Sequence, residues 1–454
     1  MITIGKPFVY DDGVYAYLKA KVEISQDTVS AYIAASHVIE KVHWRTHEDY
    51  PPKCWQDENS GLWFAVPLEY KDGLCADRGD AFVASFLWYA MITGSDIKSE
   101  APLSQQMVFN IKRFLIPALC TDQNGYRRID ILGETTSEPV RNAAAVGTGM
   151  SCGVDSFYTA NQYVRPDTPS RYRLTHLCYF NMGAIFHPDR QSKKEYTVKE
   201  FYDTTDRMSE EKRDLARQVA DQSNMPLVYV KSNLDSDYYR GAYGHTGVYR
   251  NCAMALSLQG LFSVYYNSSG GWPGYFDLTL TEGSQHYEAL LCQCLSTESL
   301  AFILSDYTTR FEKTAVIADD KLAQKYLDVC FRFNNCGTCS KCIRTLVTLE
   351  ILGKLDQFAD VFNIDYFKKH RAQAYYKILL TKSGDAKDDD AVFTRDLYKR
   401  AKEKNLIPFS SYLKYWLVTI LGINKIKKGA KHLAKRVLSP DTIRSLKARF
   451  SRNG

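Results

Sequence analysis

The sequence predicts an α/β protein built around a parallel sheet. Short apolar runs at residues 143–146, 174–180 and 227–230 are typical of buried strands, and the charged segment 198–222 is typical of a helix between the last two. Strands that alternate with helices favour a parallel sheet covered by helices on both faces. With 454 residues, the chain is long enough for two or more domains.

Residues 1–140 are predicted to form a separate N-terminal α+β domain. Its expected elements are a hairpin at 8–24, a strand at 62–68, helices at 80–92 and 104–119, and a last strand at 128–132. Ser104 is the expected N-cap of the second helix, because its hydroxyl can accept a backbone N–H. No catalytic cluster stands out, so we expect this domain to select a substrate or to bind a partner protein.

The core domain is predicted at residues 141–350, followed by a helical extension at 351–400 and a basic amphipathic tail at 401–454. A glycine-rich loop at 241–247 is expected to lead into an apolar helix from Ala253 to Tyr266. The chemistry is expected in the core domain, because the motifs described next all lie there.

Residues 146–160 combine a strand end, a loop of glycines and short polar residues, and the start of a helix expected at 157–163. Such an arrangement presents backbone N–H groups and the positive end of a helix to phosphate. Ser151 and Ser156 can donate hydroxyls, and Asp155 can cap the helix or hold Mg²⁺. An ordinary glycine-rich turn between a strand and a helix explains the same residues equally well.

This loop differs from the best-known phosphate loops. No lysine follows the glycines, as the GxxxxGK[ST] loop requires, and Cys152 stands where GxGxxG needs its third glycine. The loop resembles the Ser-Gly-Gly-x-Asp-Ser signature of PP-loop ATP pyrophosphatases. Ser151, Gly153, Asp155 and Ser156 match that signature, with Cys152 in place of its first glycine.

Four cysteines follow within thirteen residues, at Cys330, Cys336, Cys339 and Cys342. Thiolates in a short loop favour tetrahedral Zn²⁺, and four of them fill a closed structural site. Disulfides, scattered core cysteines or a redox CxxC pair are the alternatives. Two ordinary disulfides do not fit so tight a run, so the spacing favours zinc.

A PP-loop motif followed by these cysteines resembles the QueC family, the 7-cyano-7-deazaguanine synthases, over about residues 141–350. Arg250 and Asn251 ahead of an apolar helix are a third match, and Lys313 and Thr314 are similar in part to the family's Thr-Lys-Ala segment. The resemblance implies a parallel-sheet core like that of adenine nucleotide alpha hydrolases. It also implies ATP with Mg²⁺, cleavage of ATP between its α and β phosphates, and structural zinc.

The resemblance also implies roles for individual residues. Ser151, Asp155, Ser156 and Arg250 would be catalytic, and ATP binding would use Ser151, Gly153, Val154, Asp155, Ser156 and Asn181. Asn181 belongs to one of two polar segments, 181–184 and 232–235, that follow predicted strands and should border the ATP site. Plain turn chemistry is the alternative for these segments, and a surface salt bridge is the alternative for Arg250.

Three further residues in loops are lesser candidates for acid–base chemistry: Glu282, His286 and Asp306. Residues 271–287 do not match the acidic, Tyr- and Pro-containing substrate segment that the QueC family carries after its Arg-Asn helix. The resemblance therefore leaves the acid substrate open.

The expected function is ATP-dependent activation of a carboxylate, such as 7-carboxy-7-deazaguanine or a related acid. Its adenylate would react with ammonia or another amine to give an amide, and a second activation would give a nitrile. A PP-loop sulfur transferase acting on RNA is one alternative; it would need a nucleophilic cysteine outside the zinc site, and Cys152 stands where it could be mistaken for one. A nucleotide-binding, non-catalytic subunit of a bacterial modification or defence system is the other.

Charge is distributed unevenly along the chain. Residues 401–454 carry 13 Lys or Arg and 2 Asp or Glu, whereas the preceding 400 residues carry 45 and 50. Residues 407–452 combine Trp and Tyr with lysines, which favours binding to an anionic membrane surface or to nucleic acid; packing on the protein body is the alternative. We expect a cytoplasmic homo-oligomer, peripheral at the inner face of the membrane if the tail binds lipid.

Overall fold

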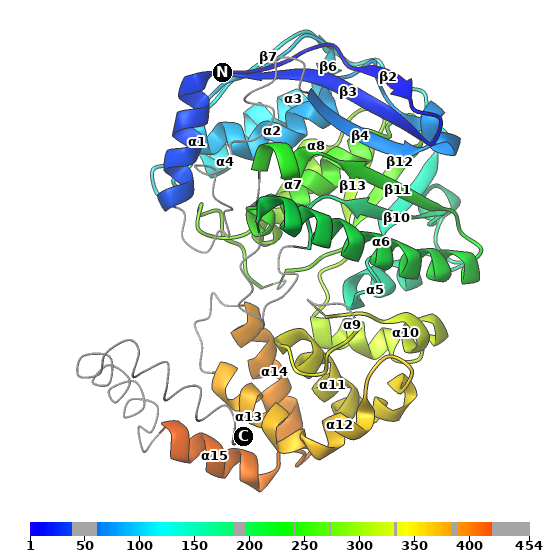
Figure 1. Cartoon of the computed structure of the whole chain (residues 1–454), viewed down its shortest axis with the longest axis vertical. Coiled ribbons are helices and arrows are strands. Elements are labelled where there is room, and N and C mark those ends of the chain that lie inside the picture. The colour runs from blue at the N-terminus through cyan, green and yellow to red at the C-terminus, as the bar shows by residue number, and fades with distance from the viewer. Residues whose placement is uncertain are drawn as a thin grey trace. The chain divides into compact units, whose positions relative to one another are not determined.

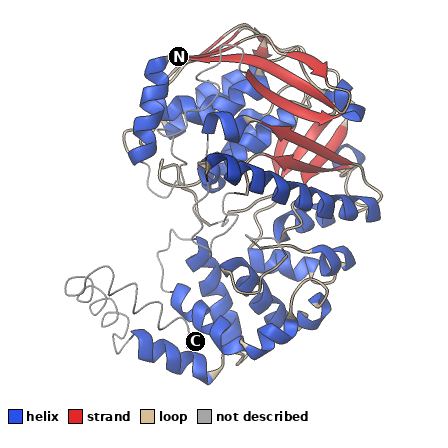
Figure 2. Cartoon of the chain, viewed as in Figure 1, coloured by secondary structure: helices blue, strands red, loops and turns tan. Residues whose placement is uncertain are grey.

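The computed structural model describes residues 1–38, 61–185, 197–239, 241–271, 274–330, 334–382 and 389–419. The chain divides into two compact units. The first comprises Met1–Cys342 with Asp356–Phe362, and the second comprises Ile343–Leu355 with Asn363–Gly454. Among the described residues, all strands belong to the first unit, and the second unit is helical (Figure 2).

Five parallel strands form the centre of the first unit. They are β9 (Ala145–Gly149), β10 (His176–Asn181), β11 (Leu227–Ser232), β12 (Phe262–Asn267) and β13 (Ala301–Leu304). Their order in the sheet is β13-β12-β9-β10-β11, so β9 has β10 on one side and β12 on the other. The chain therefore continues from β9 to β10 and β11 on one side and returns to β12 and β13 on the other. In sheets with such a change of direction, ligands bind in the crevice outside the carboxyl ends of the strands, at the point of change.

Helices cover the two faces of this sheet. On one face lie α5 (Val154–Tyr163) and α6 (Val198–Gln222), and the Tyr179 hydroxyl of β10 reaches Ser209 of α6 at 3.2 Å. On the other face the main hydrophobic core joins the sheet to α2 (Asp80–Thr93), α7 (Tyr243–Leu256) and α8 (Glu288–Leu295). Every residue of α2 is buried, which accounts for its lack of a polar side.

The strands of residues 1–140 join the same sheet. Strand β4 (Gly61–Pro67) pairs antiparallel with β11, bringing Ala65 opposite Lys231, and the sheet continues through β3 (Tyr15–Ile24). In Figure 1 these blue strands lie alongside the green ones. We predicted a separate domain up to residue 140, but the structure shows no break in the sheet there. Pairing with β4 satisfies the backbone groups of β11 that an edge strand would leave open.

The remaining strands extend or flank this sheet. They are β1 (Ile2–Ile4), β2 (Phe8–Asp11), β5 (Ile97–Ser99) and β7 (Ile131–Leu132), with β6 (Leu103–Ser104) and β8 (Thr135–Thr136) as a separate pair. The other helices of the first unit are α1 (Gln26–Val38), α3 (Gln105–Asn110), α4 (Ile116–Leu119), α9 (Arg310–Ile317) and α10 (Lys321–Tyr326).

The second unit contains most of α11 (Ser340–Leu352), then α12 (Ile364–Lys369), α13 (Arg371–Thr381), α14 (Asp389–Glu403) and α15 (Phe409–Thr419). This agrees with the helical extension predicted at 351–400. No helix in the described part of the chain is both long and apolar enough to cross a bilayer. Residues 420–454, which hold most of the predicted basic tail, lie outside the described residues.

Several predicted elements are confirmed. The hairpin is β2 with β3, the strand at 62–68 is β4, and the charged helix is α6. Ser104 caps α3 as expected, since its Oγ accepts the backbone N–H of Met107 at 3.0 Å. Local sequence signals therefore located the elements that depend on local turns and caps.

Other predicted bounds are wrong. The strand expected at 143–146 continues to Gly149, and the helix expected from residue 157 begins at Val154, so the loop between them is short. The apolar helix expected from Ala253 to Tyr266 is the end of α7 followed by β12. Gly260 lies in the turn between them, where the chain packs so closely that a Cβ would lie 3.0 Å from the carbonyl oxygens of Asp72 and Gly73. The strand expected at 128–132 is reduced to β7.

Candidate functional site

The loop after β9 lies at the carboxyl end of the sheet, at the point where the strand order changes direction between β10 and β12. Residues 150–153 connect β9 to α5, and Gly153 occupies the N-cap of α5 without any side chain capping that helix. The first N–H groups of a helix have no partner within it. The sequence therefore places an uncapped, positively polarised helix end at the point in the sheet where ligands bind.

Cys152 sits in this loop with a backbone φ of 59°, a left-handed conformation that glycine adopts most easily. Its side chain is fully buried, and burial raises the pKa of its thiol to about 12. The PP-loop signature that this loop resembles carries glycine at this position. The observed conformation explains why glycine suits it.

We expect Cys152→Gly to be tolerated, with the free energy of unfolding changed by no more than about 1 kcal/mol, because relief of backbone strain offsets the lost side-chain packing. Cys152→Val should cost roughly 1–3 kcal/mol, since a β-branched residue strongly disfavours positive φ. Urea denaturation of the two variants beside the native protein measures both effects. Equal destabilisation by glycine and valine would show that the backbone at residue 152 is not strained.

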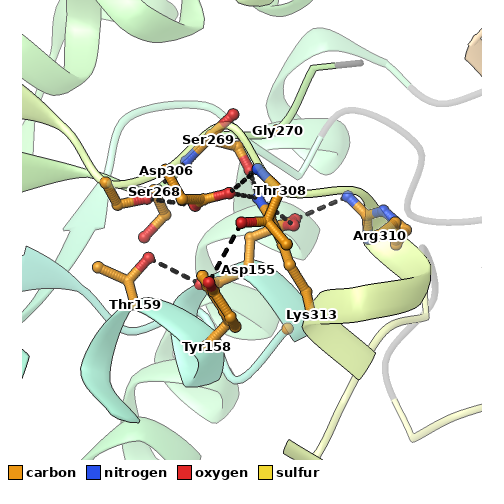
Figure 3. Close-up of polar contacts among 12 residues, drawn as sticks. Asp155, Tyr158, Thr159, Ser268, Ser269, Gly270, Asp306, Thr308, Arg310 and Lys313 are labelled. Carbon is orange, nitrogen blue, oxygen red and sulfur yellow. Dashed lines mark hydrogen bonds and ion pairs between the residues drawn. The ribbon is translucent and has the colours of Figure 1, made fainter. Parts of the chain in front are cut away.

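Asp155, in the first turn of α5, faces cations from α9. Its Oδ2 accepts from Arg310 at 2.7 Å, and its Oδ1 lies 3.5 Å from Nζ of Lys313 (Figure 3). Burial opposes ionisation of Asp155, but Arg310, Lys313 and Lys341 outweigh it and lower the pKa of the carboxyl. Mg²⁺, which we expected Asp155 to hold, would have to displace one of these cations from the carboxylate.

Lys313 ties the ends of three strands together at this crevice. Its side chain is 2% exposed, and Nζ donates to the Ser269 carbonyl at 2.7 Å and pairs with Asp306 at 3.0 Å (Figure 3). Ser269 follows β12, Asp306 follows β13, and Asp155 follows β9. Cations gathered beside an uncapped helix N-terminus suit the binding of an anion such as phosphate.

The two serines of the loop differ in exposure. Ser156 is 3% exposed and its Oγ donates to the Gly153 carbonyl at 3.0 Å, whereas Ser151 is exposed and lies 3.4 Å from the Ser156 hydroxyl. Val154 is buried, so only its backbone can meet a ligand. Ser151 is the hydroxyl of this loop that a ligand in solvent reaches most directly.

A buried hydrogen-bond chain leads from α7 to this crevice. Asn251 donates to Asn267 at 2.7 Å, Asn267 donates to Glu288 at 3.2 Å, and Ser269 donates to the other Glu288 oxygen at 2.7 Å. The carbonyl of Ser269 is the group that Lys313 contacts. Burial raises the pKa of Glu288 to about 7, although the donors around it favour the carboxylate.

This raised pKa gives a stability prediction. Folded Glu288 holds its proton up to about pH 7, whereas an exposed glutamate releases it near its ordinary value of 4.5, so the native state loses stability as pH rises between those values. Relative to Glu288→Gln, the native protein should lose roughly 3 kcal/mol of unfolding free energy from pH 4.5 to pH 8. Urea denaturation of both proteins across this range tests it. If the unfolding free energies of the two proteins changed with pH in the same way, the raised pKa of Glu288 would be contradicted.

Arg250 was predicted to contact a phosphate or a carboxylate, with a surface salt bridge as the alternative. It is fully buried in α7, pairs with Asp235 at 2.8 Å and donates to the Met182 carbonyl at 2.9 Å. Gly183, at φ +82°, allows this packing, because a Cβ there would lie 2.6 Å from Asp235 Cγ. Arg250 is therefore a buried ion-pair partner that joins the loops after β10 and β11.

Asn181 lies at the carboxyl end of β10 as predicted, but its side chain turns toward α6 and donates to Asp206 at 3.4 Å. It lines a cavity of about 260 Å³ on the α6 face. The lining also includes Trp63, Tyr202, Asp206, Tyr229 and Lys231. Both polar segments that follow β10 and β11 therefore border this cavity, and their predicted place beside an ATP site stays a prediction.

The four cysteines form one cluster. The sulfurs of Cys330, Cys336, Cys339 and Cys342 all lie within 4.8 Å of one another, so they can hold a metal ion together. Backbone N–H groups point at three of them: Cys336 to Cys330 at 3.5 Å, Cys339 to Cys336 at 3.4 Å, and Cys342 to Cys339 at 3.5 Å. Such donors favour thiolates. Four thiolates match the preference of Zn²⁺ and leave no open coordination position.

Comparison with known proteins adds no relative: the chain matches no family model, no curated protein and no solved structure. A functional proposal therefore rests on the geometry of the site and on the sequence motif within it.

Sequence reasoning missed part of the site. Arg310, Lys341 and Glu288 were not selected, and Lys313 was noted only for its partial family match. A cation spaced three residues before Lys313 on one helix was the available signal for Arg310. Among the lesser candidates, Asp306 joins the site through its ion pair with Lys313. Glu282 and His286 face each other at 3.7 Å, and neither takes part in the ion pairs that Asp155 and Lys313 form among the described residues.

Proposed function

We propose that this protein is an ATP pyrophosphatase of the PP-loop kind that activates a carboxylate. One observation carries the proposal: an uncapped helix N-terminus at the crevice of a parallel sheet, where Arg310 and Lys313 contact Asp155 and Lys341 also lowers the pKa of its carboxyl. The match of Ser151, Gly153, Asp155 and Ser156 to the PP-loop signature supports it.

In the proposed reaction the N–H groups of the loop and the Ser151 hydroxyl hold the β and γ phosphates. A carboxylate oxygen of the substrate attacks the α phosphorus, pyrophosphate departs, and an acyl-adenylate forms. Ammonia or another amine then attacks the acyl carbon, loses a proton and displaces AMP, which leaves an amide. Mg²⁺ bound with ATP would spread the charge of the departing pyrophosphate, and Zn²⁺ at the four cysteines would be structural.

The resulting expectation is AMP with pyrophosphate rather than ADP with phosphate, because the loop lacks the lysine that acts on the γ phosphate in Walker loops. The assay supplies 7-carboxy-7-deazaguanine and then other acids, with ammonia as the amine. Acids labelled with heavy oxygen should transfer one label to AMP, which reports direct attack by the carboxylate. ADP alone, or no binding of ATP, would contradict the proposal.

The two alternatives make different predictions. A sulfur transferase needs a reactive thiol, whereas Cys152 is buried and its pKa is raised to about 12. A non-catalytic subunit of a bacterial modification or defence system would bind ATP without releasing pyrophosphate. Pyrophosphate release that survives alkylation of exposed thiols supports the carboxylate ligase. ATP binding without any release supports the subunit.

For the tail we propose contact with an anionic membrane surface. Phe409, Leu413, Trp416 and Leu417 of α15 are between 36% and 79% exposed and recur at the spacing of one helix face. Strongly basic sequence follows them. Vesicles containing phosphatidylserine should co-sediment the full chain, and less of it as salt rises, whereas a chain ending at residue 406 should remain in solution. Equal sedimentation of the two chains would contradict this role.

A further inference from the structure

The loop after β9 is in direct contact with the segment that leads to the four cysteines. The backbone N–H of Asp328 donates to the Cys152 carbonyl at 2.8 Å. Cys152 is the loop residue held at positive φ, and Asp328 precedes Cys330 by two residues. The conformation of the loop therefore depends on where residue 328 is held.

Asp328 is itself anchored from two directions through its carboxylate. One oxygen accepts the backbone N–H of Cys330 at 3.0 Å, and the other pairs with Lys212 of α6 at 3.1 Å. The carboxylate is 5% exposed, so solvent screens these contacts weakly. Asp328 thus connects three parts of the fold: its side chain contacts the cysteine segment and helix α6, and its backbone N–H contacts the loop.

Asn335, the residue before Cys336, holds the residues on either side of Asp328. Its side chain accepts the Val329 N–H at 2.9 Å and donates to the Leu327 carbonyl at 2.6 Å. Cys330 and Asn335, which lie beside or among the four cysteines, therefore both hold residues 327–330 in place. A metal ion bound by the four cysteines would fix these residues, whereas four thiolates without a metal would repel one another and release them.

We propose that Asp328 is a positioning residue that couples metal binding at the four cysteines to anion binding by the loop at residues 150–156. This inference rests on the proposed phosphate-binding role of the loop. Coupling between two sites is reciprocal, so a bound anion must retain the metal as strongly as the metal favours the anion. The effect of the anion on zinc retention can therefore be measured, and replacing a residue that only stabilises the fold would not change it.

The test uses the full chain loaded with Zn²⁺, inorganic pyrophosphate as the anion, and a chromophoric chelator. For the native protein, saturating pyrophosphate should lower the equilibrium transfer of zinc to the chelator about 10-fold, and zinc removal should weaken pyrophosphate binding by the same factor. In Asp328→Ala both ligands should still bind, but each should no longer affect the other. Asp328→Asn, which keeps an oxygen for the Cys330 N–H, should retain part of the effect.

The matched control is Asp320→Ala. Asp320 also accepts nearby backbone N–H groups, at Leu322 and Ala323, and it caps α10. This control should keep the full coupling. If Asp328→Ala does not fold, Asp328→Asn with the same two measurements decides the question.

The outcomes separate the two levels of inference. If zinc-loaded native protein does not bind pyrophosphate, the proposed loop function is wrong. If pyrophosphate binds but does not change zinc retention, or if Asp328→Ala couples as strongly as the native protein, only the role of Asp328 is overturned.

Discussion

Cys339→Ser is expected to abolish tight metal binding and to unfold the segment around residues 327–342. The four sulfurs lie within 4.8 Å of one another, and the backbone N–H groups of the segment point at them. In small closed sites the free energy of metal binding is largely free energy of folding, about 10 kcal/mol or more for structural zinc. Losing one of four thiolates should remove most of it.

Elemental analysis of the purified protein should find one zinc per native chain and much less in Cys339→Ser. Limited proteolysis should cut the variant within the cysteine segment and spare the native protein. The control is Cys294→Ala, which removes a buried thiol of α8 outside the cluster. A native protein without zinc, or with a disulfide among the four cysteines, would contradict the metal site.

The cluster could be predicted because its signal is local. Four thiols within thirteen residues must lie near one another whatever the rest of the fold does. The same holds for α6, where Thr197 and Glu200 form a capping box, and for the hairpin of β2 and β3, which turns at Asp12 and Gly13. In each case the interactions that decide the structure join residues close in sequence.

The pairing of β4 with β11 could not be predicted in this way. It joins residues about 165 positions apart, such as Ala65 and Lys231, and no local pattern specifies which strand takes an open sheet edge. The same limit explains the error at 253–266. An apolar run fits a helix or a buried strand equally well, and the turn between α7 and β12 lies where Gly260 packs closely on Gly73, a residue far away in sequence.

The candidate site shows both limits together. The loop at residues 151–156 was found from its sequence, because a phosphate-binding turn is a local structure. The cations that contact Asp155 come from α9, which follows β13, and they are brought to it by the order of β9, β12 and β13 in the sheet. The raised pKa of Glu288 depends on burial, which the sequence around it does not reveal.

Lys313→Met is expected to cause a large loss of both stability and ATP turnover. Lys313 is 2% exposed and contacts Asp155, Asp306 and the Ser269 carbonyl. Removing its charge leaves Asp306, itself 6% exposed, without its cation, and breaking a buried pair by deleting one partner costs about 3–5 kcal/mol. Turnover of ATP to AMP should also fall, by about 10²-fold or more, because a positive charge at the proposed phosphate site is lost.

Denaturation and the AMP assay measure these two effects, and a second substitution separates them. Lys313→Met combined with Asp306→Asn removes the stranded carboxylate and should recover much of the stability, since a neutral amide is less costly to bury than an unpaired charge. It should recover little of the activity, because the cation at the phosphate site is still missing. Lys321→Met is the control, as Lys321 lies on the next helix and contacts Gln324. If Lys313→Met behaves like Lys321→Met in both measurements, Lys313 does not organise this site.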